Sequence, residues 1–489
     1  TSSVALGENA GQTDQLGYSV AIGSGAGQTD QGVFSVGVGI AAGNTAQGNA
    51  GVAVGANAGS ITQGQSAVGI GNGAAQNFQG DFSVAVGVYA GKDSQGENAI
   101  AIGNSAGEDS QGEKAIAIGF NSGNDNQGVS GVSVGWNSGQ ISQGSGSVAV
   151  GKNAGQTTQG ASSTAVGTGS GQTAQGTFSV AFGAGAGNNQ QGSQSVSIGN
   201  SAGNRSQGNS SVAIGPSAGR YSQSNLSIAI GDNAGSDSQQ NNAIAVGTNS
   251  GEFQQGQFST AIGPSAGKTG QGINSVAIGS QAGTDSQGAN AVAIGDLAAK
   301  TLQGMYSVGI GRAAGSTNQD SNSIAIGNSA AQQYQGPSSI AIGHSTAVNY
   351  QGTNSIAIGP SAAQDSQGDF GIAIGWRAAR IEQRFKSVAM GWQAGRDSQG
   401  ELSVALGPNG GRTSQGVRSV SIGDSAGRNN QGDTSVAVGS RAGRLNQGVS
   451  SVAVGLLAGE TAQHTKSVAI GYLAGNSSQD SSSVAIGDE

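Results

Sequence analysis

Hydrophobic and polar positions alternate in a short motif that recurs along the whole chain. Ser19-Val20-Ala21-Ile22-Gly23 is a typical copy. β-Branched residues hold the second and fourth places of the motif, and Ser, Ala or Gly hold the first, third and fifth. Alternation with a period of two predicts a strand, and such frequent glycines are incompatible with a long helix. The motif therefore predicts an all-β chain.

The motif repeats every 16 residues without insertion or deletion. Its last glycine falls at Gly7 and at each sixteenth residue up to Gly487, and a column of glutamines runs in the same way from Gln15 to Gln479. Sixteen residues are too few for a helical hairpin or a propeller blade, but they suit one coil of a β-solenoid. No linker or change of composition interrupts the array. We therefore predict one domain over residues 1–489, a parallel β-roll of about 30 coils, stacked about 4.8 Å apart.

Within the repeat, charge is confined to certain columns. With the serine of the motif as position 1, every Asp, Glu, Lys and Arg lies at position 6, 7, 10, 11, 12, 14, 15 or 16. The small residues of the strand, such as Ser275, Ala277 and Gly279, form a stripe without charge or bulk. Such a stripe lets another backbone approach closely, so we expect it to face outward and contact a second chain. The alternative is that these columns lie flat in a tight turn.

The glutamine column at position 13 has a structural and a functional interpretation. Stacked glutamine amides can bond to the copies above and below them, or they can cap backbone groups of the return turn. A polar stripe that binds a ligand is the alternative. Identical residues in every coil favour the structural interpretation, and we expect a ladder of amides that includes the following glutamines: Gln31, Gln271, Gln287 and Gln399.

Composition excludes several classes of protein. The 489 residues include 92 glycines but only 5 prolines and no cysteine, which excludes collagen, disulfides and thiolate chemistry. The longest apolar runs are a few residues long, so we expect no membrane insertion. The formal net charge of -8 argues against nucleic acid as a general partner.

Basic residues gather near the end of the sequence. Of 19 Lys and Arg, 11 lie between Arg377 and Lys466. Position 10 carries arginine in five consecutive coils, which in a solenoid would form a line of guanidinium groups about 4.8 Å apart. Two tryptophans occupy position 6 of neighbouring coils. The candidate site for an anion or glycan consists of Arg380, Arg396, Arg412, Arg428, Arg444, Trp376 and Trp392. A solvated basic edge and, for the tryptophans, a covered groove between chains are the alternatives.

No constellation of residues indicates catalysis. The two histidines, His344 and His464, fall in different columns and cannot share a face. No recurring set of serine, histidine and aspartate is present, and glycine-rich strings lack the strand–loop–helix context of a phosphate-binding loop. We therefore expect neither an enzyme nor a metal site, and no cofactor.

The motif resembles the head repeats of trimeric autotransporter adhesins. The resemblance covers the whole chain and is carried by segments such as Ser275-Val276-Ala277-Ile278-Gly279 and Ser467-Val468-Ala469-Ile470-Gly471. It implies a left-handed parallel β-roll of three chains, in which the Val/Ile pair fills each roll and the small residues pack toward the trimer. Similar arrays occur in viral fibre proteins.

These observations together predict a structural fibre segment. We expect an extracellular homotrimer at a cell surface, in which a rigid filament presents its variable loops for adhesion to host glycans or matrix. A fibre or decoration protein on a virus particle is one alternative, and an ice-binding solenoid is another.

Overall fold

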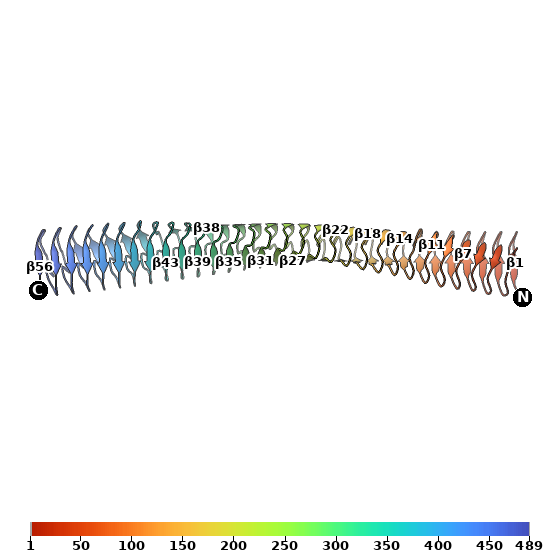
Figure 1. The fold of residues 1–489 in the computed structure, drawn as a ribbon, viewed down its shortest axis with the longest axis horizontal. Helices are drawn as coiled ribbons and strands as arrows, with labels where there is room; N and C mark the ends of the chain where they lie inside the picture. The colour runs from red at the N-terminus through yellow and green to blue at the C-terminus, as the bar shows by residue number, and fades with distance from the viewer. Residues whose placement is uncertain (1, 489) are drawn as a thin grey trace. The chain divides into compact units, whose positions relative to one another are not determined.

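The computed structural model describes residues 2–488, and the chain divides into two compact units, Thr1–Ala243 and Ile244–Glu489. Each unit is a stack of similar coils of strands and turns (Figure 1), and residues 2–488 contain no helix. Within these residues, therefore, no helix is available to cross a membrane.

The first strand of each coil is the alternating motif. It is three residues long and begins at every sixteenth residue, from β1 (Val4–Leu6) and β2 (Val20–Ile22) to β56 (Val484–Ile486). It covers positions 2–4, so the β-branched residues stand at its two ends and a small residue in its middle.

The second strand ends at the glutamine. It begins as β3 (Thr29–Gln31) and recurs in most coils up to β53 (Leu445–Gln447), covering positions 11–13. Four copies are shortened to two residues, namely β9 (Phe78–Gln79), β11 (Ser94–Gln95), β40 (Tyr334–Gln335) and β42 (Tyr350–Gln351). In two further coils only an isolated bridge at the glutamine remains, at Gln111 and Gln367.

Within each unit, every strand pairs in parallel with its copy one repeat away. In the C-terminal unit, β33 (Val276–Ile278) pairs with β35 (Val292–Ile294) so that Ala277 faces Ala293. In the N-terminal unit, β2 pairs with β4 (Val36–Val38) in the same way. Because the offset is always one repeat, each sequence column becomes a straight line of residues along the unit.

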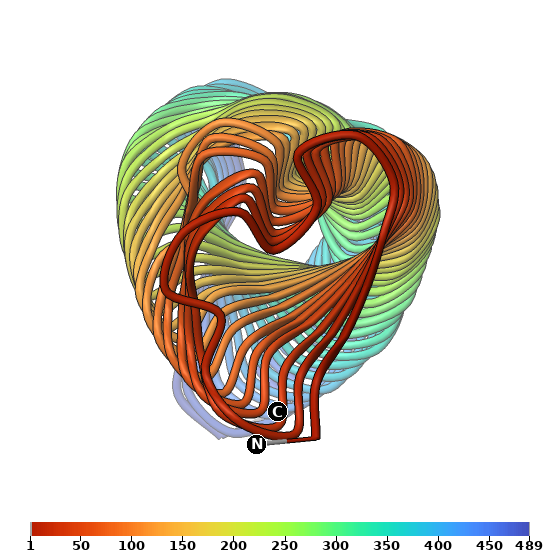
Figure 2. The same ribbon diagram turned by 90° about the vertical axis from the view of Figure 1, so that its right-hand side faces the viewer.

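The glycine at position 5 is required by the turn that follows the first strand. Gly279 has φ +124°, in a region that side chains rarely adopt. A Cβ atom there would lie 2.7 Å from the carbonyl oxygen of Gly295 in the next coil. Close stacking of coils and a left-handed backbone therefore both demand glycine. In the N-terminal unit, the stacked coils follow one path, each slightly rotated from the one before (Figure 2).

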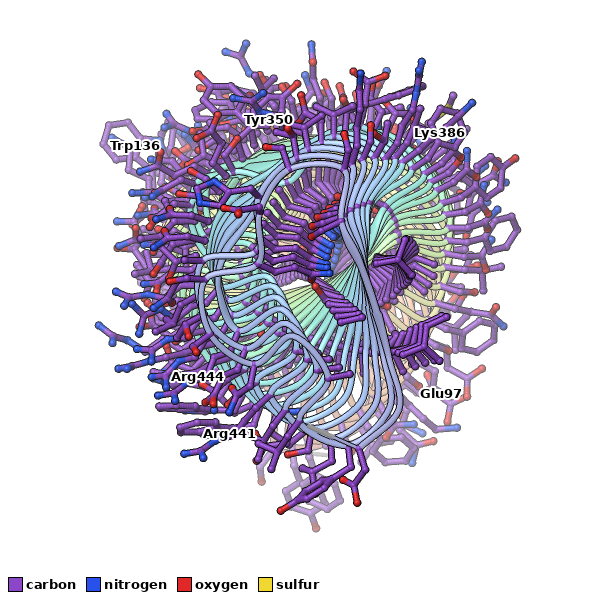
Figure 3. The ribbon with its side chains drawn as sticks, turned by 90° about the vertical axis from the view of Figure 1, so that its left-hand side faces the viewer. Glu97, Trp136, Tyr350, Lys386, Arg441 and Arg444 are labelled. Atoms are coloured by element: carbon purple, nitrogen blue, oxygen red, sulfur yellow. The ribbon has the colours of Figure 1, made fainter. Side chains whose placement is uncertain are left out.

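The interior of the coil contains only small side chains and one amide. Buried apolar residues are all alanines, at positions 3 and 8 in most coils, and the largest fully buried side chains are glutamines of position 13. Seen along the C-terminal unit, amide groups stack inside the coil while carbon-only side chains stack outside it (Figure 3). The glutamine therefore fills the space that a 16-residue coil encloses and leaves room beside it only for small side chains.

The predicted fold class, an all-β parallel solenoid of 16-residue coils, is confirmed. The chain divides into two compact units, so a single domain over residues 1–489 stays a prediction.

Candidate interaction surfaces

The β-branched residues of the motif lie on the outside of the coil. We call positions 2 and 4 of the first strands the Val/Ile stripe; Val276 and Ile278 are members. Both are half-buried, and many position 4 residues stay more exposed, such as Ile262 at 39% and Met390 at 42%. In each unit the stripe therefore presents a continuous line of apolar side chains to its surroundings.

The expectation that the small residues face outward is wrong. Ser275 and Ala277 are 0% exposed and point into the coil, and Gly279 is half-buried in the turn. The Ser275 hydroxyl donates to the carbonyl oxygen of Gly272 at 2.6 Å, which satisfies it in the interior. The implication that the Val/Ile pair fills each roll is also wrong, because glutamine and small residues fill the interior and Val276 and Ile278 lie outside it.

The glutamine column lies in the interior and connects successive coils. Gln271 and Gln287 are each 3% exposed, Gln31 is 0% exposed and Gln399 is 1% exposed. Gln271 Nε2 donates to Gln287 Oε1 at 3.1 Å and to the carbonyl oxygen of Thr260 at 2.9 Å. Most of these amides thus reach across their coil to the first strand and along the unit to the next glutamine, but the ladder is interrupted where the side-chain oxygens of Gln127, Gln367 and Gln415 lack a donor among the described residues. Gln287 Nε2 also donates to the carbonyl oxygen of Ala291, directly after the return turn, at 3.4 Å, so the ladder and the capping role predicted from the sequence occur together.

Replacing Gln271 and Gln287 by leucine should open these coils. Each substitution leaves strand carbonyls and a neighbouring amide without partners inside the coil, at a cost of about 1–3 kcal/mol per site. Hydrogen exchange of the two coils should accelerate, and the melting temperature should fall. Gln257→Leu is the matched control, because Gln257 lies half-buried at position 15, where Ile273 already stands. Unchanged exchange in the double variant would show that the amides are dispensable.

The five arginines of position 10 form one line in the C-terminal unit. Each directly precedes a second strand, of which β45 (Ile381–Gln383) is the first and β53 the last. The strands between them pair in register, so the arginines lie in adjacent coils. Arg444 projects outward from the coil beside Arg441 (Figure 3). We call Arg380, Arg396, Arg412, Arg428 and Arg444 the arginine line.

The charge of the arginine line is neutralised unevenly. Arg396 Nη2 lies 2.6 Å from Asp397 Oδ2, and Arg444 Nη1 lies 3.0 Å from Glu460 Oε1. Arg380 Nε donates to Gln364 Oε1 at 3.0 Å. Burial lowers the pKa of Arg412, and repulsion by its two arginine neighbours lowers it further. The charge of Asp397 acts against this lowering of the Arg412 pKa, so the positive charge in the middle of the line is only partly compensated.

The tryptophans at position 6 cover one another. The Trp376 and Trp392 rings stack with centroids 5.5 Å apart and planes 12° apart. The guanidinium carbon of Arg377 lies 4.3 Å from the Trp376 ring centroid. The stacked pair leaves less ring face for a sugar than two separate rings would. The pair therefore contributes less to a glycan site than the sequence alone suggests.

A second charged surface lies in the N-terminal unit and is acidic. Asp93, Asp109 and Asp125 occupy position 11 of three consecutive coils, next to Glu108. Burial raises the pKa of Asp109, and a hydrogen bond with Asp93 and the charge of Glu108 raise it further. Over residues 2–488, no group of three or more Asp, Glu or His is arranged to hold a metal ion.

Sequence reasoning missed the amides that accompany the arginine line. Gln393, only 6% exposed, and Asn409 occupy position 7, and a buried side-chain oxygen of each lacks a hydrogen-bond partner among the described residues. Position 7 looks like an ordinary variable turn position in the sequence. Its proximity to position 10 of the next coil appears only when the coils are stacked.

Comparison with known proteins gives one result for this fold. The family described as YadA head domain repeat (2 copies) matches residues 225–250, 271–298 and 335–362. No curated protein matches the chain. The resemblance to the head repeats of trimeric autotransporter adhesins is thereby confirmed.

Proposed function

We propose, from the premise that three segments match the YadA head domain repeat, that this chain is a self-associating fibre segment exposed at a cell surface. That family consists of structural adhesins rather than enzymes, and it supports a structural role for this chain. The Val/Ile stripe is the observation that carries the proposal.

A lone chain leaves its most hydrophobic residues in water. The coil interior holds alanine, serine, glycine and glutamine, whereas Val276 and Ile278 lie on the outer surface. Full burial of a valine or isoleucine side chain contributes about 1.5–3 kcal/mol, and much of that gain is not realised in one chain. Contiguous apolar surface of this kind marks an interaction site.

A second copy of the chain is the partner that fits this stripe. Its own stripe has the same spacing along the unit, because both are set by the same parallel strand pairing. Association of identical chains in closed symmetry also leaves no apolar edge exposed. The similarity to trimeric head repeats supports three chains, and three stripes would then meet along a common axis.

Adhesion is the role that this arrangement serves. The variable positions of the repeat, including the arginine line, lie outside the Val/Ile stripe and stay available to ligands in the trimer. The interior amides and the glycine turns stiffen each coil, so the variable side chains are presented at fixed spacing. Host glycans or matrix are the ligands that we propose.

The molar mass of the purified chain in solution tests the proposal. Light scattering should give three times the 47.1 kDa of one chain, independently of ionic strength, because the interface is apolar. A mass equal to one chain at micromolar concentration would refute self-association.

A further inference from the structure

Two arginines in the middle of the arginine line have no partner within the chain. Over residues 2–488, neither the Arg412 nor the Arg428 side chain forms an ion pair, and the buried Nε of each lacks a hydrogen-bond acceptor. Their neighbours Arg396 and Arg444 are both paired with carboxylates. Two adjacent guanidinium groups therefore retain nearly all of their donors.

The repeat places the position 7 amides Gln393 and Asn409 next to this pair. In this fold a position 10 side chain reaches back to position 7 of the preceding coil, as Asn188 Nδ2 does when it donates to the Gly169 carbonyl oxygen at 2.9 Å. The same offset of 19 residues relates Arg412 to Gln393 and Arg428 to Asn409. These two amides therefore border the pair, each with a buried side-chain oxygen that has no hydrogen-bond partner among the described residues.

An oxyanion matches this set of groups. Guanidinium groups bind oxyanions through two parallel N–H···O hydrogen bonds. Neighbouring coils place the two arginines about 4.8 Å apart, close enough to share one anion. The flanking Arg396 and Arg444 are paired with Asp397 and Glu460, so the two coils between these arginines carry the least neutralised charge of the line.

We propose that Arg412 and Arg428 bind sulfate groups of a linear sulfated polysaccharide. A polymer suits the site because further arginines continue the line on both sides of the pair. Single-stranded nucleic acid fits less well, because it needs free aromatic faces for its bases, and the nearby tryptophan rings stack on each other. The inference gives a ligand class to the adhesion proposed above and rests on it only for its biological use.

The full-length chain and two variants test this inference on immobilised heparin. Arg412→Gln with Arg428→Gln removes the pair, and glutamine already stands at position 10 in Gln156 and Gln172, so the coil accepts it. Arg220→Gln with Lys300→Gln is the matched control, because it removes two charges from the same column outside the arginine line. Circular dichroism and molar mass verify the fold and the association of each variant.

We expect the parent chain and the control to bind heparin at low salt and the pair variant to bind at least tenfold more weakly. Binding should weaken steeply as salt screens charges beyond about 8–10 Å. Inorganic sulfate should compete only at much higher concentration than heparin. Equal loss in the control, unchanged binding in the pair variant, or tighter binding of a single-stranded oligonucleotide than of heparin would overturn the inference. If the pair variant loses heparin binding but keeps the mass of three chains, the result concerns the binding site and not the proposed self-association.

Discussion

A single cysteine in place of Ile278 should join chains covalently upon mild oxidation. The chain has no cysteine of its own, so each introduced thiol can pair only with its copy in another chain. Copies of a residue that faces a common axis come close to one another, and a disulfide forms when Cα atoms lie within about 7 Å. Denaturing electrophoresis should show most of the protein as linked pairs, which in the parent chain are absent.

Ile273→Cys provides the control for this experiment. Ile273 is also an apolar residue, 48% exposed, but it stands at position 15, away from the Val/Ile stripe. It should give only the slow cross-linking of colliding molecules, which depends on protein concentration. Equal and concentration-dependent linking at both positions would show that the stripe is not an interface.

Replacing Ala277 and Ala293 by leucine should prevent their coils from closing. Both side chains are 0% exposed, and the Ala277 Cβ already lies only 3.3 Å from where a Cβ on Gly283 would stand. Leucine in so narrow an interior costs about 1–3 kcal/mol or more per site through overpacking. Limited proteolysis should cut the chain near these coils, and the melting temperature should fall.

Ala289→Leu makes the same chemical change at a tolerant place. Ala289 is half-buried at position 15, where Val129 and Ile273 stand in other coils. This variant should resist protease as well as the parent does. If Ala277→Leu and Ala293→Leu left protease resistance intact but changed the molar mass, the small residues would be an interface after all.

The solenoid could be predicted because its signals are local. A period of two across Ser275–Gly279 and a strict period of 16 define the strand and the coil without knowledge of the tertiary structure. The amide ladder could be predicted for a similar reason, since glutamine recurs at position 13 in every coil.

Which face of the strand lies inside could not be obtained from alternation alone. Alternation separates two faces, but the space enclosed by the coil decides which face fits. A usable signal was present in the sequence: positions 2 and 4 vary in size from Thr164 to Phe182, whereas positions 1 and 3 never exceed serine. Variation in size indicates room, and the uniformly small columns indicate confinement.

The partners of the arginine line depend on contacts between coils. Asp397 is adjacent to Arg396 in the sequence, but Glu460 is 16 residues from Arg444, and the proximity of Gln393 to Arg412 needs an offset of 19. Many charged residues share these columns, and side-chain direction decides which of them meet.

The glutamine amides give each unit a polarity at the atomic level. Gln271 donates to Gln287, and Gln287 to Gln303, always toward the C-terminus, so the amide dipoles point one way. At the start of one such run, the Gln31 carbonyl oxygen has no donor among the described residues. A coil added in the same orientation extends the run, whereas an inverted coil would oppose two carbonyl oxygens or two amino groups. The N-terminal end of a run of glutamines therefore presents a free amide oxygen, which accepts, and the C-terminal end presents a free amide N–H, which donates.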